Sequence, residues 1–354
     1  MLFAQLRRQH MFNLKRLIPS ALALALLGLA GPTANAQAQK LTLRVADSLP
    51  TTHIFSIGFQ NWMKRVTELT GGQVSFQHFP GEQLGKRKDM FDMARNGTVD
   101  IAYVLPVDHQ AQLARATVVE LPGFATLSSC GTPVLRGILG EYMNEEYVSR
   151  GVRPLLALYV GGYEIFSNRD VRLPSDLKGM KVRSAGGSQD VTLKALGAVP
   201  ISLASPEVYE SMGRKTIDGV LFPWTGVPPW KLNEVAKNST YGAALGATVL
   251  IYLINESVYQ RLPQNVKAAM AKATDDVSPA LIAEQDKTLT DLVVKLKGSG
   301  MKIIDLTRDD LAVWRKSLVD VERSWLDSSA KSGVKDPQSI IQKRDALAVA
   351  ANCK

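Results

Sequence analysis

The sequence predicts an α/β protein with two lobes, each built on a doubly wound sheet and joined by a hinge and a long bridging helix. Three observations support this fold class. The order strand, helix, strand, helix, strand occurs twice, within residues 41–104 and again within residues 181–222, and it is the half-unit of a doubly wound sheet. An apolar, β-branched stretch at 246–254 is typical of a strand crossing back to the first lobe. A helical pattern from 263 to about 297 is long enough to brace both lobes.

The first unit opens with an alternating stretch and continues with apolar residues at helical spacing. Leu41, Leu43 and Val45 alternate with polar residues, which predicts a strand. The helix that follows, from Phe55 to Leu69, is closed by two glycines at the position of a C-cap. The unit then continues with a strand at 74–76, a helix at 90–94 and a strand at 99–104.

The second unit repeats this order without an obvious sequence repeat. Its expected elements are a strand at 181–183, a helix at 189–196, a strand at 199–203, a helix at 207–213 and a strand at 217–222. A helix near 132–149 and a strand near 155–160 are expected between the two units.

These elements set the expected domain boundaries. Lobe I is predicted to comprise residues 37–160 and about 250–290, and lobe II residues 161–249 and about 291–335. A helical tail is expected at 336–354. Two crossing strands and one long helix would then form the hinge.

The N-terminal residues 1–36 have the features of a secretory signal peptide. Four basic residues and no acid precede an apolar run at 21–30, and the segment ends in Ala34-Asn35-Ala36, an A-x-A cleavage site. Met1 and Met11 both remain possible starts. The run is short for a membrane span, which needs about 20 residues, although an N-terminal anchor is the alternative. The sequence therefore predicts an exported, soluble protein.

Composition gives weaker constraints. The formal net charge is +9, but four of the positive charges lie in the signal segment. A mild basic excess without a Lys/Arg run suits a small anionic ligand better than nucleic acid, and equally suits a solvated basic surface. Two cysteines, Cys130 and Cys353, are able to pair in an oxidising compartment, but the sequence leaves their pairing open.

No constellation of residues points to catalysis, to a metal or to a cofactor. His53, His78 and His109 are scattered and lack partners at ligand spacing. The sequence contains no phosphate-binding glycine loop and no nucleophile elbow. We therefore expect a binding protein rather than an enzyme.

The carboxyl ends of the predicted parallel strands identify the expected site, because ligands bind beyond those ends. Arg183 ends one of these strands, just before a glycine-rich turn opens a helix. Its guanidinium could hold a carboxylate through two parallel hydrogen bonds, although an exposed arginine on a surface turn is the alternative. The strand-end segments expected to line a shared cleft are Asp47–Ser48, Tyr103–Pro106, Arg183–Ser184 and Phe222–Trp224.

The stretch Leu173–Arg183, which reads LPSDLKGMKVR, closely resembles the signature of TRAP transporter solute-binding proteins, the DctP-like family. The resemblance covers most of residues 41–262, in matching order and spacing. Its other pieces are Thr70–Gly72, Phe79–Gly85, Gly97–Ala102, Lys194–Ala198, Pro206–Glu210 and Ile217–Gly219.

This resemblance implies a periplasmic protein whose two lobes share a long bracing helix and close on an organic acid. The protein would deliver that acid to ion-driven TRAP membrane permease subunits, and we expect it to be a monomer. Arg183 stands where the family has its carboxylate-binding arginine.

Two departures from the family pattern bear on the ligand. Tyr163 occupies the place of a second arginine found in many members, and Val220–Trp224 replaces the common Gln-Glu-Asn-Pro. One cation beside several rings favours a monocarboxylate with an apolar or aromatic body. Trp230 is an alternative wall residue, for which packing in the core is the stronger expectation. The candidate ligand-binding residues are Arg183, Phe222, Trp224, Tyr163, Tyr103, Asp47 and Ser205.

Three alternatives remain open at this point. The ligand could be a C4-dicarboxylate or a small 2-oxo or 2-hydroxy acid. The cleft could serve a periplasmic enzyme, with Glu164 and Asp190 as the nearest acids. The protein could also present its ligand to a membrane sensor.

Overall fold

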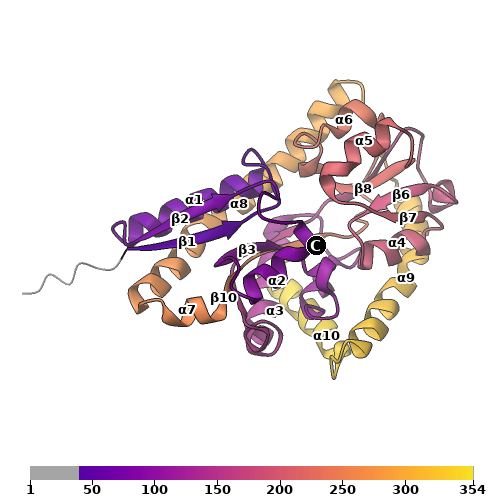
Figure 1. The fold of residues 1–354 in the computed structure, drawn as a ribbon. Helices are drawn as coiled ribbons and strands as arrows, with labels where there is room; N and C mark the ends of the chain where they lie inside the picture. The colour runs from indigo at the N-terminus through magenta and orange to yellow at the C-terminus, as the bar shows by residue number, and fades with distance from the viewer. Residues whose placement is uncertain (1–39, 354) are drawn as a thin grey trace, which may run out of the picture. The chain divides into compact units, whose positions relative to one another are not determined.

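Two mixed sheets organise residues 40–353, the part of the chain that the computed structural model describes (Figure 1). The predicted signal peptide at 1–36 lies outside the described residues. Five strands form the first sheet in the order β2-β1-β3-β10-β4, and six form the second in the order β11-β9-β5-β8-β6-β7. This arrangement confirms the predicted two-lobed α/β fold, and we call the two sheets with their helices lobe I and lobe II.

Lobe I contains the first predicted unit. Its strands are β1 (Leu41–Ala46), β2 (Val74–Phe79), β3 (Ile101–Val104), β4 (Val152–Val160) and β10 (Thr248–Asn255). The sheet is not purely parallel, because β10 runs antiparallel to both of its neighbours, β3 and β4. Every residue of β10 is buried, as expected for a strand inside a sheet that is covered on both faces.

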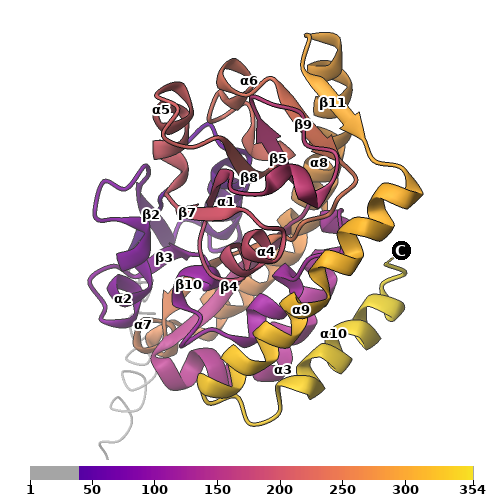
Figure 2. The ribbon, with the colours of Figure 1, turned by 90° about the vertical axis from the view of Figure 1, so that its right-hand side faces the viewer.

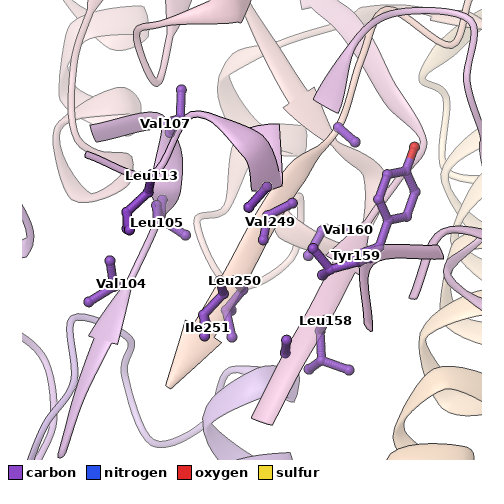
Figure 3. Packing of buried hydrophobic residues seen from close by; sticks show 14 of the residues in the cluster. Val104, Leu105, Val107, Leu113, Leu158, Tyr159, Val160, Val249, Leu250 and Ile251 are labelled. Carbon is purple, nitrogen blue, oxygen red and sulfur yellow. The ribbon is translucent and has the colours of Figure 1, made fainter. Parts of the chain in front are cut away.

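The core of lobe I lies along these central strands. Figure 3 shows apolar side chains from β3, β4 and β10 packed together, among them Val104, Leu158 and Ile251. The helix α1 (Ile54–Leu69) buries one apolar face, and its Trp62 indole N–H donates to Thr274 Oγ1 at 2.9 Å. The helices α2 (Met90–Arg95), α3 (Ser128–Tyr142) and α7 (Glu256–Arg261) complete the lobe.

Lobe II contains the second predicted unit and three strands that the sequence pattern did not indicate. The predicted strands are β6 (Lys181–Ser184), β7 (Val199–Ser202) and β8 (Gly219–Pro223), with α4 (Ser188–Ala195), α5 (Val208–Gly213) and α6 (Leu232–Val235) beside them. The additional strands are β5 (Tyr163–Ser167), β9 (Asn238–Tyr241) and β11 (Lys302–Asp305). Because β5 is antiparallel to both β8 and β9, this sheet is also mixed.

The chain passes between the two sheets through two short segments. The first joins β4 to β5 through Gly161 and Gly162, and Gly162 adopts a positive φ of 68°. A Cβ at Gly161 would lie 2.2 Å from the Thr126 carbonyl oxygen, so the backbone approach there requires glycine. The second segment joins β9 to β10. A 3.1 Å hydrogen bond from Leu245 N in this segment to Tyr163 O, directly after the first segment, links the two crossings.

One long helix supports both lobes, as predicted. The helix α8 (Gln264–Gly298) packs against α1 and α3 of lobe I and against β11 of lobe II. Figure 1 shows it in orange, passing from beside α1 toward the elements around α6.

Two further helices end the described chain. The helix α9 (Arg308–Lys331) begins with a capping box between Thr307 and Asp310. It runs past α4 toward α10 (Pro337–Ala350), which packs on α3 (Figure 2). None of the helices in residues 40–353 is long and apolar enough to cross a membrane.

The helix α9 also contacts both lobes. The indole N–H of Trp314 donates to Arg172 O, and that of Trp325 donates to Thr117 Oγ1, each at 2.9 Å. The lobe boundaries given above, including the end of lobe II near residue 335, remain predictions.

Cys130 in α3 and Cys353 after α10 form a disulfide, with their Cα atoms 5.2 Å apart. The pairing that the sequence left open is thus made, and it ties the C-terminal helix to lobe I. The two cysteines are separated by 223 positions in the sequence. In the chain-entropy account, such a link stabilises a fold by restricting the unfolded chain.

We predict that Cys353→Ser lowers the free energy of unfolding by about 2–4 kcal/mol and exposes α10 to proteolysis. Urea denaturation and limited proteolysis would measure the two effects. In the matched control, reductant should destabilise the wild type but leave Cys130→Ser/Cys353→Ser unchanged. Equal stability of the oxidised and reduced wild type would contradict this role.

Candidate functional site

Residues of both lobes line one cavity at the strand ends where the sequence predicted a site. The cavity measures about 510 Å³ when the space open to solvent at its mouth is included. From lobe I it is lined by Leu49, His53, Phe55, Arg87, Tyr103, Leu105, Val160, Thr248 and Leu250. From lobe II it is lined by Tyr163, Arg183, Ala185, Ser205, Phe222, Pro223, Thr225, Gly226 and Trp230.

Arg183 is the central cation of this cavity. It lies on β6, between β8 and β7, and only 2% of the residue is exposed. Its Nε donates to Leu203 O at 2.9 Å, its Nη2 donates to Ser205 Oγ at 3.4 Å, and its Cζ lies 4.9 Å from the centre of the Phe222 ring. These contacts fix the plane of the guanidinium while the group still lines the cavity.

The charge of Arg183 has no acidic partner within residues 40–353, since the structure shows no salt bridge to it there. Burial lowers its pKa to about 10, so the guanidinium stays protonated near neutral pH. A buried unpaired charge is costly and requires a counter-charge. A small anion entering the cavity could supply that charge.

The walls of the cavity are mainly apolar. Tyr103, Tyr163 and Phe222 are each at most 4% exposed, and all three line the cavity. Burial raises the pKa of both tyrosines, so their hydroxyls stay protonated. His53 also lines the cavity, and burial lowers its pKa to about 4, so it is neutral near pH 7.

Five of the seven candidate residues thus meet in one cavity: Arg183, Phe222, Tyr163, Tyr103 and Ser205. The two exceptions are Trp224 and Asp47. Trp224 is 1% exposed and packs edge-on against Phe166, with ring centres 4.9 Å apart, in the core of lobe II. The lining tryptophan is instead Trp230, which the sequence had placed in the core.

Asp47 is absent from the cavity lining and belongs to a buried hydrogen-bond network. Its carboxylate accepts from Tyr252 Oη at 2.9 Å, from Ser56 Oγ at 3.2 Å and from Leu49 N at 2.9 Å, and it lies 3.2 Å from His78 Nε2. These partners hold the loop after β1 and occupy the carboxylate.

Arg87 is a lining residue that the sequence analysis missed. It belongs to a short 3-10 turn, Arg87–Asp89, and its Nη1 lies 3.1 Å from Oδ2 of the buried Asp108. Because it stands between two lysines in Lys86-Arg87-Lys88, nothing in the local pattern distinguishes it from a solvated basic turn. Only the tertiary structure shows that it is buried.

Glu164 and Asp190, the acids that the sequence analysis named for a possible enzyme, do not line the cavity. Glu164 is buried in the hinge, where it accepts from Thr240 Oγ1 and from the backbone N–H groups of Gly242, Ala243 and Ala244. Asp190 accepts a hydrogen bond from Ser184 Oγ. Neither carboxylate is placed as a partner for chemistry in the cavity.

The lobes touch beside the cavity at Gly187, the residue that caps α4. A Cβ there would lie 2.5 Å from Val107 Cγ2 and 2.8 Å from Gln110 Nε2, both in lobe I. Gly187 also has a positive φ of 58°. Glycine therefore permits both the turn and the close contact between the lobes.

Within residues 40–353, no group of three or more His, Cys, Asp or Glu side chains is placed to hold a metal ion. The arrangement consists of a buried cation, apolar walls and a hinge, which together can enclose and release a small anion.

A cavity enclosed between two hinged lobes is the arrangement of a solute-binding protein. The family model DctP, described as bacterial extracellular solute-binding protein, family 7, matches residues 45–327, and the chain belongs to this family. The resemblance to TRAP solute-binding proteins noted from the sequence motifs is thereby confirmed.

Relatives and solved structures agree with this assignment. The chain is 28% identical to the C4-dicarboxylate-binding periplasmic protein DctP of Rhodobacter capsulatus over 262 residues, which cover 71% of this chain and 76% of that protein.

Two structures of TRAP solute-binding proteins share the fold. One, from a marine metagenome, is described as specific for aromatic acid ligands and holds 3-hydroxybenzoate; the TM-score is 0.80 at 22% identity, covering 89% of this chain and 99% of that one. The other, from Bordetella bronchiseptica, holds (R)- and (S)-mandelate; the TM-score is 0.79 at 21% identity, covering 87% and 99%.

A buried carboxyl group at the second crossing segment gives a test of the hinge. Glu120 is 1% exposed, and its Oε1 accepts from Val249 N, at the start of β10, at 2.8 Å. Burial raises its pKa from 4.5 to about 8. The folded protein therefore binds a proton at the Glu120 carboxyl group more tightly than the unfolded chain does.

We predict that stability associated with Glu120 is complete below pH 4.5 and is lost as the pH rises through about 8. The loss should be on the order of a few kcal/mol. Glu120→Gln, which keeps a neutral side chain of the same shape, should lack this loss, so the difference between the two proteins in unfolding free energy should change between pH 5 and pH 9. A difference independent of pH would contradict the raised pKa.

Proposed function

We propose that this chain is the extracytoplasmic solute-binding protein of a TRAP-type importer, and that it captures an organic monocarboxylate with an apolar or aromatic body. The observation that carries the proposal is the buried Arg183 guanidinium, which lines the cavity and has no acidic partner within residues 40–353. A carboxylate would supply the missing charge through two parallel hydrogen bonds.

The charges of the cavity favour one carboxylate over two. Arg183 and Arg87 both line it, but Arg87 is paired with Asp108 at 3.1 Å, which leaves one uncompensated positive charge. A dicarboxylate would bring a second negative charge without a free cation to receive it. This count argues against the dicarboxylate named for the Rhodobacter capsulatus relative.

The walls favour a flat or apolar body. Phe222, Tyr163, Tyr103 and Trp230 surround the cavity with aromatic surface, which buries large apolar areas and stacks on rings. The structural neighbours that hold 3-hydroxybenzoate and mandelate support this ligand class, since both are aromatic monocarboxylates.

The remaining parts of the proposal follow from the family. Delivery to TRAP membrane permease subunits and export to the periplasm are proposed on family membership and on the signal-peptide pattern of residues 1–36.

A thermal-shift titration tests the proposed ligand class. Benzoate and mandelate should raise the melting temperature of the wild type, with about 2.7 kcal/mol of stabilisation at 100 times the dissociation constant. Succinate and malate should give no shift at equal concentration. A shift caused only by the dicarboxylates would overturn the proposed ligand class.

The variant Arg183→Met should lose the shift with every acid. Because it removes a buried charge without a partner, its ligand-free stability should equal or exceed that of the wild type. Arg172→Met, at an exposed arginine paired with Asp310, is the matched control and should bind normally. If Arg183→Met binds benzoate with wild-type affinity, the cation is not the anchor.

A further inference from the structure

Arg87 is a second cation at the cavity, and it is paired with Asp108. Arg87 is 8% exposed, and the Asp108 side chain is 1% exposed, so the pair is nearly removed from solvent. Arg87 lines the cavity, whereas Asp108 lies behind it in the 3-10 turn Pro106–His109. The cavity is therefore lined by one cation without an acidic partner among residues 40–353, Arg183, and by one cation held by an acid, Arg87.

The pair has hydrogen-bonding capacity that the protein does not use. Among the described residues, Arg87 Nε and both carboxylate oxygens of Asp108 have no hydrogen-bond partner of good geometry. A guanidinium carries five N–H donors in a fixed plane, and one ion-pair contact uses only part of them. Buried polar groups normally have partners, so an unused donor at a cavity wall indicates a group supplied by the ligand.

The charge of the pair limits what that group can be. Asp108 compensates Arg87, so a second carboxylate at Arg87 would also face the negative charge of Asp108. A neutral oxygen accepts a hydrogen bond from Arg87 without that repulsion. A hydroxyl or carbonyl oxygen has this property.

We propose, on the basis of the function proposed above, that Arg87 binds a neutral hydroxyl or carbonyl oxygen on the body of the ligand and that Asp108 is a positioning residue that excludes a second carboxylate. The ligand is then a monocarboxylate that carries a further oxygen. Arg183 of lobe II holds the carboxylate and Arg87 of lobe I holds the other oxygen, so a bound ligand bridges the lobes.

The contact between the lobes lies on the same turn as Asp108. Val107 directly precedes Asp108, and it faces Gly187 of lobe II at the close approach described above. A ligand that engages Arg87 therefore acts next to the point where the lobes meet. This placement makes the polar group a determinant of closure as well as of affinity.

Calorimetric titration with three sets of probes tests the proposal. The probes are benzoate, its 2-, 3- and 4-hydroxy derivatives, and the three benzenedicarboxylates, which place hydrogen, hydroxyl or carboxylate on the same ring. For the wild type, at least one hydroxybenzoate should bind about tenfold more tightly than benzoate. The dicarboxylate substituted at the same ring position should bind more weakly than benzoate.

Two variants should change this preference in different ways. Arg87→Met should bind benzoate and the hydroxybenzoate with equal affinity. Asp108→Asn should leave the charge of Arg87 uncompensated and improve binding of the matching dicarboxylate at least tenfold. A merely structural role of Asp108 would not produce that gain.

Because each single change unpairs a buried charge, Arg87→Met/Asp108→Asn is the charge-balanced control if a single variant does not fold. It should lose the preference for the hydroxyl without gaining dicarboxylate binding. A preference that survives the loss of Arg87, or dicarboxylate binding unaffected by Asp108→Asn, would overturn the inference. Failure of every benzoate to bind the wild type would instead overturn the proposed function.

Discussion

One buried guanidinium, that of Arg183, determines what the cavity can bind. Arg183 is held in place by the Leu203 carbonyl, by Ser205 and by the Phe222 ring, but none of these groups carries a negative charge. Burial disfavours its charged form, yet the pKa remains near 10, so the charge persists. The fold therefore leaves a positive charge at the cavity without a negatively charged partner, and a bound anion would supply that partner. Selective capture and release follow from this unpaired charge, because the ligand contributes what the protein leaves out.

The segments that join the two sheets are the second structural feature on which the proposed capture depends. Two short crossing segments join the sheets, and two buried glutamates hold the second of them. Glu164 accepts hydrogen bonds from residues 242–244, and Glu120 accepts one from Val249 in β10. Backbone N–H groups that would otherwise lose their partners in these segments are satisfied by carboxylates. The long helix α8 packs against elements of both lobes and braces them across the crossing segments.

Much of the fold could be predicted from sequence because its signals are local. The helical periodicity of α1 and the apolar, β-branched stretch of β10 predicted these elements correctly. The long helical pattern of α8 predicted the helix that packs against both lobes. The strands β5, β9 and β11 were missed because short strands in mixed sheets depend on partners distant in sequence. The candidate residues were chosen from strand ends and from the family resemblance, and five of them line one cavity. The burial of Arg87, and the positions of Trp224 in the core and Trp230 at the cavity, depend on tertiary packing, which no local pattern encodes.

The central claim is that Arg183 is the anchor for a ligand carboxylate between the two lobes. A crystal structure of the complex with benzoate tests it most directly. We expect the benzoate carboxylate oxygens to lie within about 3 Å of the Arg183 guanidinium nitrogens. The benzoate ring should pack against Phe222, and residues of both lobes should contact the ligand. A carboxylate bound elsewhere, or an Arg183 side chain paired with a protein acid in the complex, would contradict the account.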